Sequence, residues 1–477
     1  MSLISICFLM LLFGTVLVYY LIPGTCRWPV LLAASLIFYA AAGKECMGYL
    51  LFSATVTWIG GILMGRVKAW KKKAVLAGAL LLNLGLLCSL KYEGFLSAEA
   101  GIHLPWGSVL LPLGISFYVF QTTAYLVDTF RGTVSPEKNP LKYLLFVSFF
   151  PQIVQGPIGR WNRLAPQLFR KNSFSLENLE SGICRMVWGF FKTMVIGDWA
   201  AVFVNTVYGD PDTCRGLILA AVLLYSIQLY ANFSGGIDIV VGVAKLFGIH
   251  LDENFRQPYF SASVGEFWRR WHMTLGSWLK DYVYIPLGGS RRGTFRTYGN
   301  LILTFLISGI WHGAGLTFVI WGVIHGVYQV LGKAFGKQKN QIYDRWQLSG
   351  KTWFLWWKRI VNFLLISFAW IFFRADSVEH AFRIIRGLFC RPEFSALLTI
   401  PAGRDGLQGT TMALCALAGG MLLLFLHSLW QEHHPGAEVL ELTDHPVLRF
   451  TVVLVLLLFI GVFGCTAQAG GFIYAQF

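Results

Sequence analysis

Long apolar stretches are the feature that most limits what this chain can fold into. Ser2–Ile22, Ala74–Leu90 and Val447–Phe463 carry one charged residue between them, Arg449. About 20 apolar residues in a helix cross a hydrocarbon core of about 30 Å. Only 13% of the chain is charged, about half the share in soluble domains, and continuous runs do not have the two-residue alternation of a barrel strand. The sequence therefore predicts an all-α polytopic membrane protein.

The distribution of basic residues predicts how the chain is oriented. Arg66–Lys73 holds five basic residues and Lys333–Lys339 holds three, and short basic loops stay on the cytoplasmic side of a membrane. Counting back three spans from Arg66 places the N-terminus outside. No Lys or Arg precedes the first run, and Tyr19 and Tyr20 stand where a cleavage site needs small residues. We expect a retained first span in the plasma (inner) membrane. We attribute the net charge of +15 to the orientation of the chain in the membrane. Nucleic-acid binding would require a soluble basic module, and the sequence contains none of sufficient size.

The rest of the chain supplies few signs of separate folding units. No internal repeat is present, and the stretch 91–107 reads as an outer loop after the fourth span. Pro151, Gly156 and Pro157 predict a break in the apolar stretch Leu144–Leu164. The nine cysteines include no C-x-x-C pair, so neither a zinc site nor a disulfide framework is indicated.

The segment "GEFWRRWHMTLGSWL", residues 265–279, is too polar for an ordinary span and too aromatic for a free loop. As one helix it places Trp268, Trp271, His272, Leu275 and Leu279 on a single face, with the arginines mostly off that stripe. This pattern is typical of an amphipathic helix at a membrane interface. The alternatives are a plain interfacial anchor and a functional site.

A second histidine lies inside the most apolar part of the chain. Residues 299–332 contain no Asp, Glu, Lys or Arg. One helix of that length would be about 50 Å long, so we predict a break at Gly313–Gly315, directly after His312. Irregular backbone at membrane depth requires protein or water around it, and an ionisable residue there is a functional candidate. His325 is expected to have a packing or hydrogen-bonding role.

Two further polar features have plainer interpretations. Asp238 is a buried acid candidate, for which pairing with a loop arginine or capping a broken helix is the favoured role. His433 and His434 form a surface pair before Pro435. No ligand set for a metal is present nearby.

Several motifs occur in an order that resembles one known family. They are "GISFYVFQTTAYLVDTFRG", "FFPQIVQGPIGR", "NFSGGIDIVVGVAKLFG", "FWRRWHMTLGSWLKDYVYIPLGGSRRG" and "LISGIWHGAG", and the C-terminal "FIYAQF" also fits. The chain resembles the membrane-bound O-acyltransferase (MBOAT) family, and within it the branch that acetylates alginate and other polysaccharides. The resemblance implies about eleven transmembrane helices, with interfacial or re-entrant helices, around a central tunnel. It also implies an essential histidine, which falls on His312, and a second polar position on His272.

This resemblance and the chemistry of acyl transfer together predict roles for the site residues. A neutral His312 can take the proton from an attacking hydroxyl. His272 would bond the oxyanion, orient the donor or position His312. The tryptophans, Trp271 and Trp311 among them, would exclude water. Substrate or donor binding is assigned to Trp271, Trp311, Arg269, Arg270 and Asp238. The two arginines would attract the phosphates of coenzyme A, and anchoring to anionic lipid is the equal alternative for them.

The expected activity is transfer of an acyl group, acetyl by preference, from a cytosolic thioester to an extracytoplasmic polysaccharide hydroxyl. The donor is acetyl-CoA or another acyl thioester, with no bound cofactor and no metal. The partners are membrane lipid, the glycan and a secreted or membrane-anchored acyltransferase. The alternatives are a teichoic-acid D-alanylation subunit using a carrier-protein thioester and a non-enzymatic transporter. One membrane domain is expected, with N-terminal spans 1–108, a catalytic core 109–335, and a cytoplasmic loop with C-terminal spans 336–477.

Overall fold

A computed structural model describes residues 3–93, 97, 112–390, 406–438, 440 and 445–464. Within these residues every regular element is a helix, which confirms the predicted all-α class. The loop expected at 91–107 and the terminal "FIYAQF" lie mostly outside them. The helices up to the centre of the chain are α1 (Ile6–Leu21), α2 (Arg27–Ala40), α3 (Lys44–Arg66), α4 (Ala69–Lys91), α6 (Ile115–Arg131), α7 (Pro140–Ser148), α8 (Trp161–Leu168), α9 (Leu176–Phe191), α10 (Asp198–Gly209) and α11 (Ile218–Leu246). The later helices are α12 (Val264–Arg270), α13 (Met273–Leu279), α14 (Thr294–His312), α15 (Leu316–Ala334), α16 (Gly336–Arg345), α17 (Thr352–Arg374), α18 (Val378–Gly387), α19 (Gly406–His433) and α20 (Pro446–Phe463).

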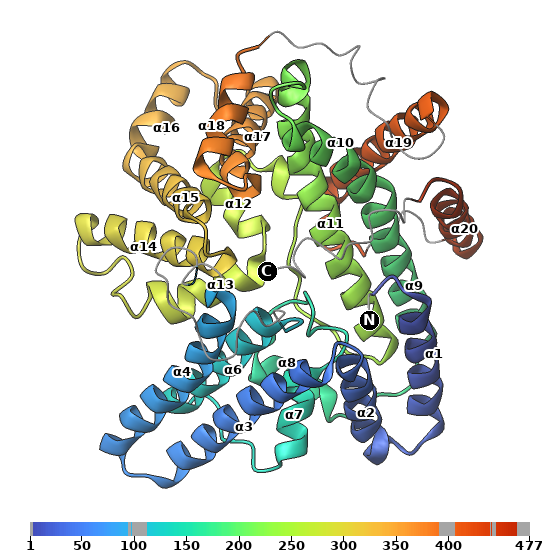
Figure 1. Cartoon of the computed structure of the whole chain (residues 1–477), viewed down its shortest axis with the longest axis vertical. Coiled ribbons are helices and arrows are strands. Elements are labelled where there is room, and N and C mark those ends of the chain that lie inside the picture. The colour runs from blue at the N-terminus through green and yellow to red at the C-terminus, as the bar shows by residue number, and fades with distance from the viewer. Residues whose placement is uncertain are drawn as a thin grey trace.

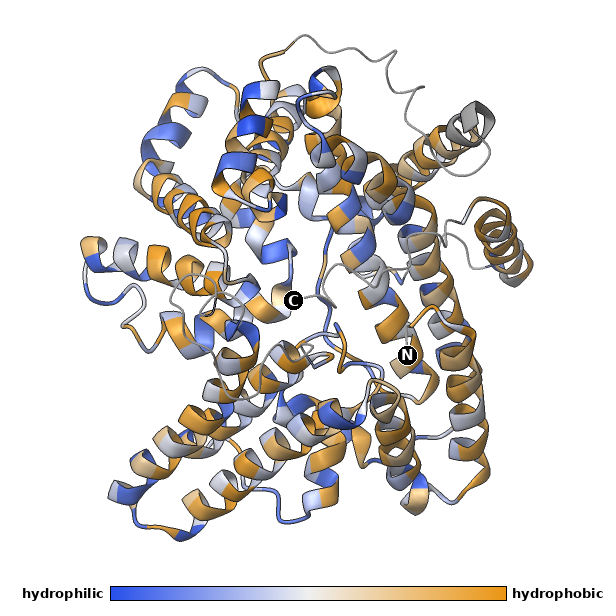
Figure 2. Cartoon of the chain, viewed as in Figure 1, coloured by the Kyte–Doolittle hydropathy of each residue, from blue (hydrophilic) through white to orange (hydrophobic). Residues whose placement is uncertain are grey.

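The helix lengths agree with a multi-pass membrane protein. By length and composition, six helical segments of the described chain can cross a bilayer, and a seventh if α15 and α16, bent by 55°, count as one. The predicted first and last runs form α1 and α20, which are apolar but shorter. Figure 2 shows α20 as almost wholly hydrophobic, whereas α16 is largely hydrophilic.

The helices form groups around two short central helices. In Figure 1, α3 and α4 lie at the lower left, α15 to α18 towards the top left, α14 at the left between these groups, and α19 and α20 at the right, with α12 and α13 nearer the centre. Serine side chains begin several of these helices by accepting a backbone N–H bond. Ser175 accepts from Asn178 at 3.3 Å and Ser263 accepts from Glu266 at 3.2 Å.

Two apolar cores meet along α9 and α11. One core contains the N-terminal helices together with the last turns of α11, and the other contains α10, α17 and the first turns of α11. The approach of α9 to α11 requires glycine. A Cβ at Gly189 would lie 2.5 Å from the carbonyl oxygen of Gly235, closer than any van der Waals contact. The close packing of α9 against α11 therefore holds the two apolar cores together.

A buried, irregular segment follows α7. Helix α7 ends at Ser148 and α8 begins at Trp161, and residues 149–160 between them are buried but not helical. This confirms the break predicted from Pro151, Gly156 and Pro157. Such backbone is tolerated inside a membrane protein when protein surrounds it, and here it packs beside the central helices.

Candidate active site

The expected single amphipathic helix through residues 265–279 is wrong in one respect. The chain forms two short helices, α12 and α13, with His272 between them in the left-handed backbone conformation at φ 45° and ψ 53°. A residue other than glycine seldom adopts this conformation, and when it does the position is often functional. The break turns Trp271 and His272 away from the common face that a continuous helix would give them.

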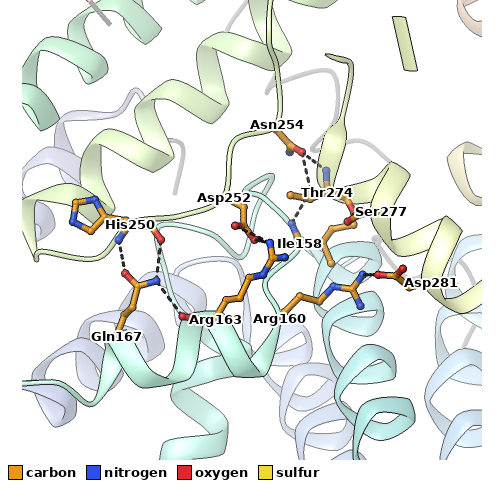
Figure 3. Close-up of polar contacts among 10 residues, drawn as sticks. All are labelled: Ile158, Arg160, Arg163, Gln167, His250, Asp252, Asn254, Thr274, Ser277 and Asp281. Carbon is orange, nitrogen blue, oxygen red and sulfur yellow. Dashed lines mark hydrogen bonds and ion pairs between the residues drawn. The ribbon is translucent and has the colours of Figure 1, made fainter. Parts of the chain in front are cut away.

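Backbone and side-chain hydrogen bonds from Asn254 hold the break in place. The Asn254 carbonyl accepts from the Met273 N–H at 3.0 Å, and its Oδ1 accepts from both the N–H and the Oγ1 of Thr274, at 3.0 and 2.7 Å. Thr274 Oγ1 in turn accepts from the N–H of Ile158 at 3.1 Å. Figure 3 shows this chain of contacts. The segment after His272 is therefore tied to two loops at once.

Further polar pairs join the same loops at their outer ends. Arg160 lies 3.1 Å from Asp281, and Arg163 lies 3.1 Å from Asp252 (Figure 3). Gln167 exchanges two hydrogen bonds with the backbone of His250. These contacts position the buried loop 149–160 and α8 against the segment that carries His272.

His312 is the last residue of α14, where the predicted break occurs. Gly313 has an extended backbone, and α15 begins only at Leu316. A Cβ at Gly313 would lie 2.2 Å from the ring of Phe318, so no larger residue fits without movement. The chain reverses here, and α14 and α15 pack as a hairpin.

The structure brings His272 and His312 to the same indole. The ring centroid of Trp311 lies 6.3 Å from that of His272 and 4.6 Å from that of His312. The two histidines are 1% and 2% exposed. Burial lowers the pKa of His272, which lies outside the spanning helices, to about 3, so this ring is neutral at physiological pH.

Aromatic rings surround both histidines. Phe233 and Phe117 contact His272, at centroid distances of 4.9 and 6.4 Å. Trp321 and Phe373 contact His312, at 5.2 and 5.1 Å. An apolar enclosure of this kind excludes water and strengthens each polar interaction inside it.

His325 lies nearer to this site than a continuous helix would allow. The hairpin places it 5.0 Å from Trp321, the ring that also contacts His312. Its Nδ1 accepts a hydrogen bond from the Trp268 indole at 3.2 Å, so His325 links α15 to α12.

Asp238, on α11, belongs to a buried ion cluster with Arg185 on α9 and Lys192 just after that helix. Its carboxylate lies 3.0 Å from the guanidinium of Arg185 and 2.5 Å from the Lys192 ammonium. Arg185 also bonds Glu253 with both terminal nitrogens. Arg185 and Lys192 are functional candidates that were not predicted from the sequence. Two cations within an apolar stretch are the pattern that could have identified them.

A cavity of about 590 Å³ opens beside this cluster. Trp271 packs against two aromatic residues of the cavity wall, with ring centroids 6.2 Å from Tyr230 and 5.0 Å from Phe255. The charged side chains in the wall are Arg185, Lys192, Asp238, Glu253, Arg256, Glu266, Arg269, Arg270, Glu432 and Glu438.

The two arginines predicted to bind the donor differ in their surroundings. Arg270 is neutralised by Glu432 at 2.6 Å and by Glu266 at 2.7 Å. Arg269 and Arg256 are exposed, and within the described part of the chain no carboxylate pairs with either. A phosphate-bearing ligand would therefore meet Arg269 and Arg256 first.

Comparison with known proteins agrees with this architecture. The sequence model of the MBOAT, membrane-bound O-acyltransferase family, matches residues 134–373. A relative from Pseudomonas fluorescens named as an alginate O-acetylase is 35% identical over 83% of this chain and 76% of its own. A peptidoglycan O-acetyltransferase from Helicobacter pylori is 36% identical over 76% of this chain and 73% of its own. A teichoic acid D-alanyltransferase from Bacillus subtilis is 29% identical over 68% of this chain and 84% of its own. The chain belongs to the membrane-bound O-acyltransferase family and is a multi-pass membrane acyltransferase.

Proposed function

We propose that this protein moves an acetyl group from cytosolic acetyl-CoA to a hydroxyl of an extracytoplasmic polysaccharide, directly or through a partner acyltransferase. The observation that carries the proposal is the meeting of His272 and His312 at Trp311, inside an aromatic enclosure. The names of the relatives that acetylate alginate or peptidoglycan support the acceptor class. Membership of an acyltransferase family sets aside the transporter alternative.

His312 is the general base in this proposal. The acceptor hydroxyl oxygen attacks the thioester carbonyl carbon while its proton passes to an imidazole nitrogen of His312. The tetrahedral intermediate collapses by breaking the carbon–sulfur bond, and His312 returns the proton to the leaving sulfur. The products are an oxygen ester and a free thiol, so the transfer needs no oxidant and no metal.

His272 is the second member of the site. A neutral imidazole can donate one N–H bond to the oxyanion that develops on the carbonyl, or it can hold His312 in place. Its left-handed backbone, fixed by Asn254, presets where the ring lies before the substrate arrives. Preset donors of this kind cost no reorganisation at the moment of reaction.

The donor is proposed to enter at the polar cavity. Arg269 and Arg256 are its unpaired cations within the described residues, and they suit the phosphates of coenzyme A. Trp271 packs against Tyr230 and Phe255 of the cavity wall and directly precedes His272 in the chain, so in this proposal it would contact the acyl arm.

The proposed orientation puts the N-terminus outside and the cavity on the cytosolic side. Arg66 ends α3 and Lys333 lies in the last turn of α15, and the preference of basic residues for the cytosolic side supports assigning both helix ends to the cytosol. This arrangement in the inner membrane lets donor and acceptor approach from opposite faces.

Vesicles of defined orientation test the donor and its side. Inside-out vesicles that hold the protein and its acceptor system should consume labelled acetyl-CoA and acquire label in the glycan, whereas sealed right-side-out vesicles should not. Label that moves only from an acylated carrier protein would replace acetyl-CoA with the donor class of the D-alanylation alternative. If neither thioester is consumed from either face, the proposed function is wrong.

A further inference from the structure

The catalytic helix of the proposal ends against a part of the chain far from it in sequence. Helix α14 ends at His312, and the last carbonyl groups of any helix have no partner within it. Gly309 bonds the N–H of Gly313 at 3.3 Å. The next two carbonyls, those of Ile310 and Trp311, accept hydrogen bonds from residues at the end of α4.

Lys91 and Tyr92 supply those two bonds. The Lys91 ammonium donates to the Trp311 carbonyl oxygen, and the Tyr92 hydroxyl donates to the carbonyl oxygen of Ile310. Consecutive residues at the end of one helix thus bond consecutive carbonyls at the end of another. A cation at a helix C-terminus also interacts favourably with the helix dipole.

The Lys91 ammonium occupies a junction of three helices. It lies 3.4 Å from Ser116 Oγ, in the first turn of α6, and 5.4 Å from the centroid of the Trp311 ring. Phe117, the neighbour of Ser116, contacts the rings of both Trp311 and His272. The Lys91 side chain therefore contacts both the backbone carbonyl and the indole of Trp311, the residue whose ring lies against the two histidines.

We propose that Lys91, assisted by Tyr92, is a positioning residue that fixes the last turn of α14 and so sets where His312 lies. Lys91 lies outside residues 134–373, which the family model matches, so the proposal gives the N-terminal helices a part in the reaction. It rests on the proposed function of His312, because the bond to the Trp311 carbonyl matters for turnover only if the next residue is the base.

The cost of losing this contact follows from the geometry of catalysis. Misplacing a catalytic group by about 1 Å can lower the rate about 100-fold, while substrate binding in a separate cavity is unchanged. Lys91→Met removes the donor and its charge but keeps a long apolar side chain. It should lower kcat by about 10- to 100-fold and leave KM for the donor unchanged.

Asn83→Ala is the matched structural control. Asn83 is also buried on α4, where its side chain bonds Ser53 on α3 and Thr122 on α6. Its substitution should lower the melting temperature while kcat per folded molecule stays near the wild-type value. Lys91→Arg keeps a charged donor and should recover most of the activity that Lys91→Met loses.

The outcomes separate this inference from the proposed function. If His312→Ala is inactive while Lys91→Met has wild-type kcat, the positioning role is overturned and the base survives. If Lys91→Arg is as slow as Lys91→Met, the charged donor is not what matters and the inference also falls. If Lys91→Met does not fold, Tyr92→Phe decides, because it removes one hydroxyl and should lower kcat with no change in KM; an unchanged kcat overturns the proposal. Activity retained by His312→Ala would overturn the proposed function instead.

Discussion

His272 and His312 are 40 residues apart in the chain, yet both rings contact the indole of Trp311. Two departures from regular helix make this possible: the left-handed residue between α12 and α13, and the chain reversal after α14. Each departure is held by close packing or by buried hydrogen bonds. Small substitutions at the break before α13 or at the turn after α14 should therefore lower the reaction rate, because they shift a histidine of the site.

Gly313→Ala should abolish most of the activity. The added methyl group would lie 2.2 Å from the ring of Phe318, so the turn after His312 has to move, and a shift of about 1 Å can cost about 100-fold in rate. Turnover of purified protein, normalised to folded protein by size-exclusion chromatography, measures the effect.

Two companion variants identify the cause. Gly315→Ala adds the same methyl group two residues later, where the nearest atom outside its neighbours is 3.5 Å away, and it should remain active. Phe318→Ala opens the space and should restore part of the activity of Gly313→Ala. If Gly313→Ala is fully active, the turn does not constrain His312.

Asp238→Ala should destabilise the fold strongly. The substitution leaves the buried cations Arg185 and Lys192 without their shared carboxylate, and breaking a buried ion pair from one side costs about 3–5 kcal/mol. The thermal midpoint in detergent should fall by many degrees. Asp252→Ala breaks the exposed pair with Arg163 and should cost at most about 1 kcal/mol. Equal losses from the two variants would contradict the structural role assigned to Asp238.

Arg269→Ala and Arg270→Ala should have different effects. Arg269 has no carboxylate partner among the described residues, so its loss should raise KM for acetyl-CoA, and the effect should shrink at high salt. Arg270 is paired with Glu266 and Glu432, so its loss should lower stability more than it changes KM. Steady-state kinetics and thermal melts of both variants test this, and the reverse pattern would return the donor role to Arg270.

The features of the site that follow from local sequence were predictable. The break after His312 follows from a glycine-rich turn inside a run too long for one span, and the break near Pro151 follows from proline chemistry. Both are confirmed. These signals depend on neighbouring residues, so no tertiary contact is needed to read them.

Features that depend on distant contacts were not predictable. The periodicity of residues 265–279 indicated one helix, but hydrogen bonds from Asn254 stabilise a left-handed residue at His272 and divide it. The arginine partner of Asp238 lies 53 residues away, on α9. From the sequence, Lys91 was expected to begin the loop 91–107. No local pattern reveals that its ammonium reaches a carbonyl 220 residues later.

The central claim is that His272 and His312 act on one transition state. His312→Ala removes the proposed general base and should lower kcat by about 10²–10⁴-fold. His272→Ala removes a bond to the oxyanion or an orienting contact and should cost less, about 2.7–4 kcal/mol at most. His325→Ala is the control, because His325 bonds Trp268 rather than the reacting groups, and it should keep substantial activity.

The double-mutant cycle of His272→Ala and His312→Ala, measured as kcat/KM for acetyl transfer to the cognate acceptor, tests the claim most directly. Residues that act as a unit are non-additive, so the double variant should be barely slower than His312→Ala alone. Additive costs for the two substitutions, or a loss from His325→Ala as large as either, would contradict a paired-histidine site.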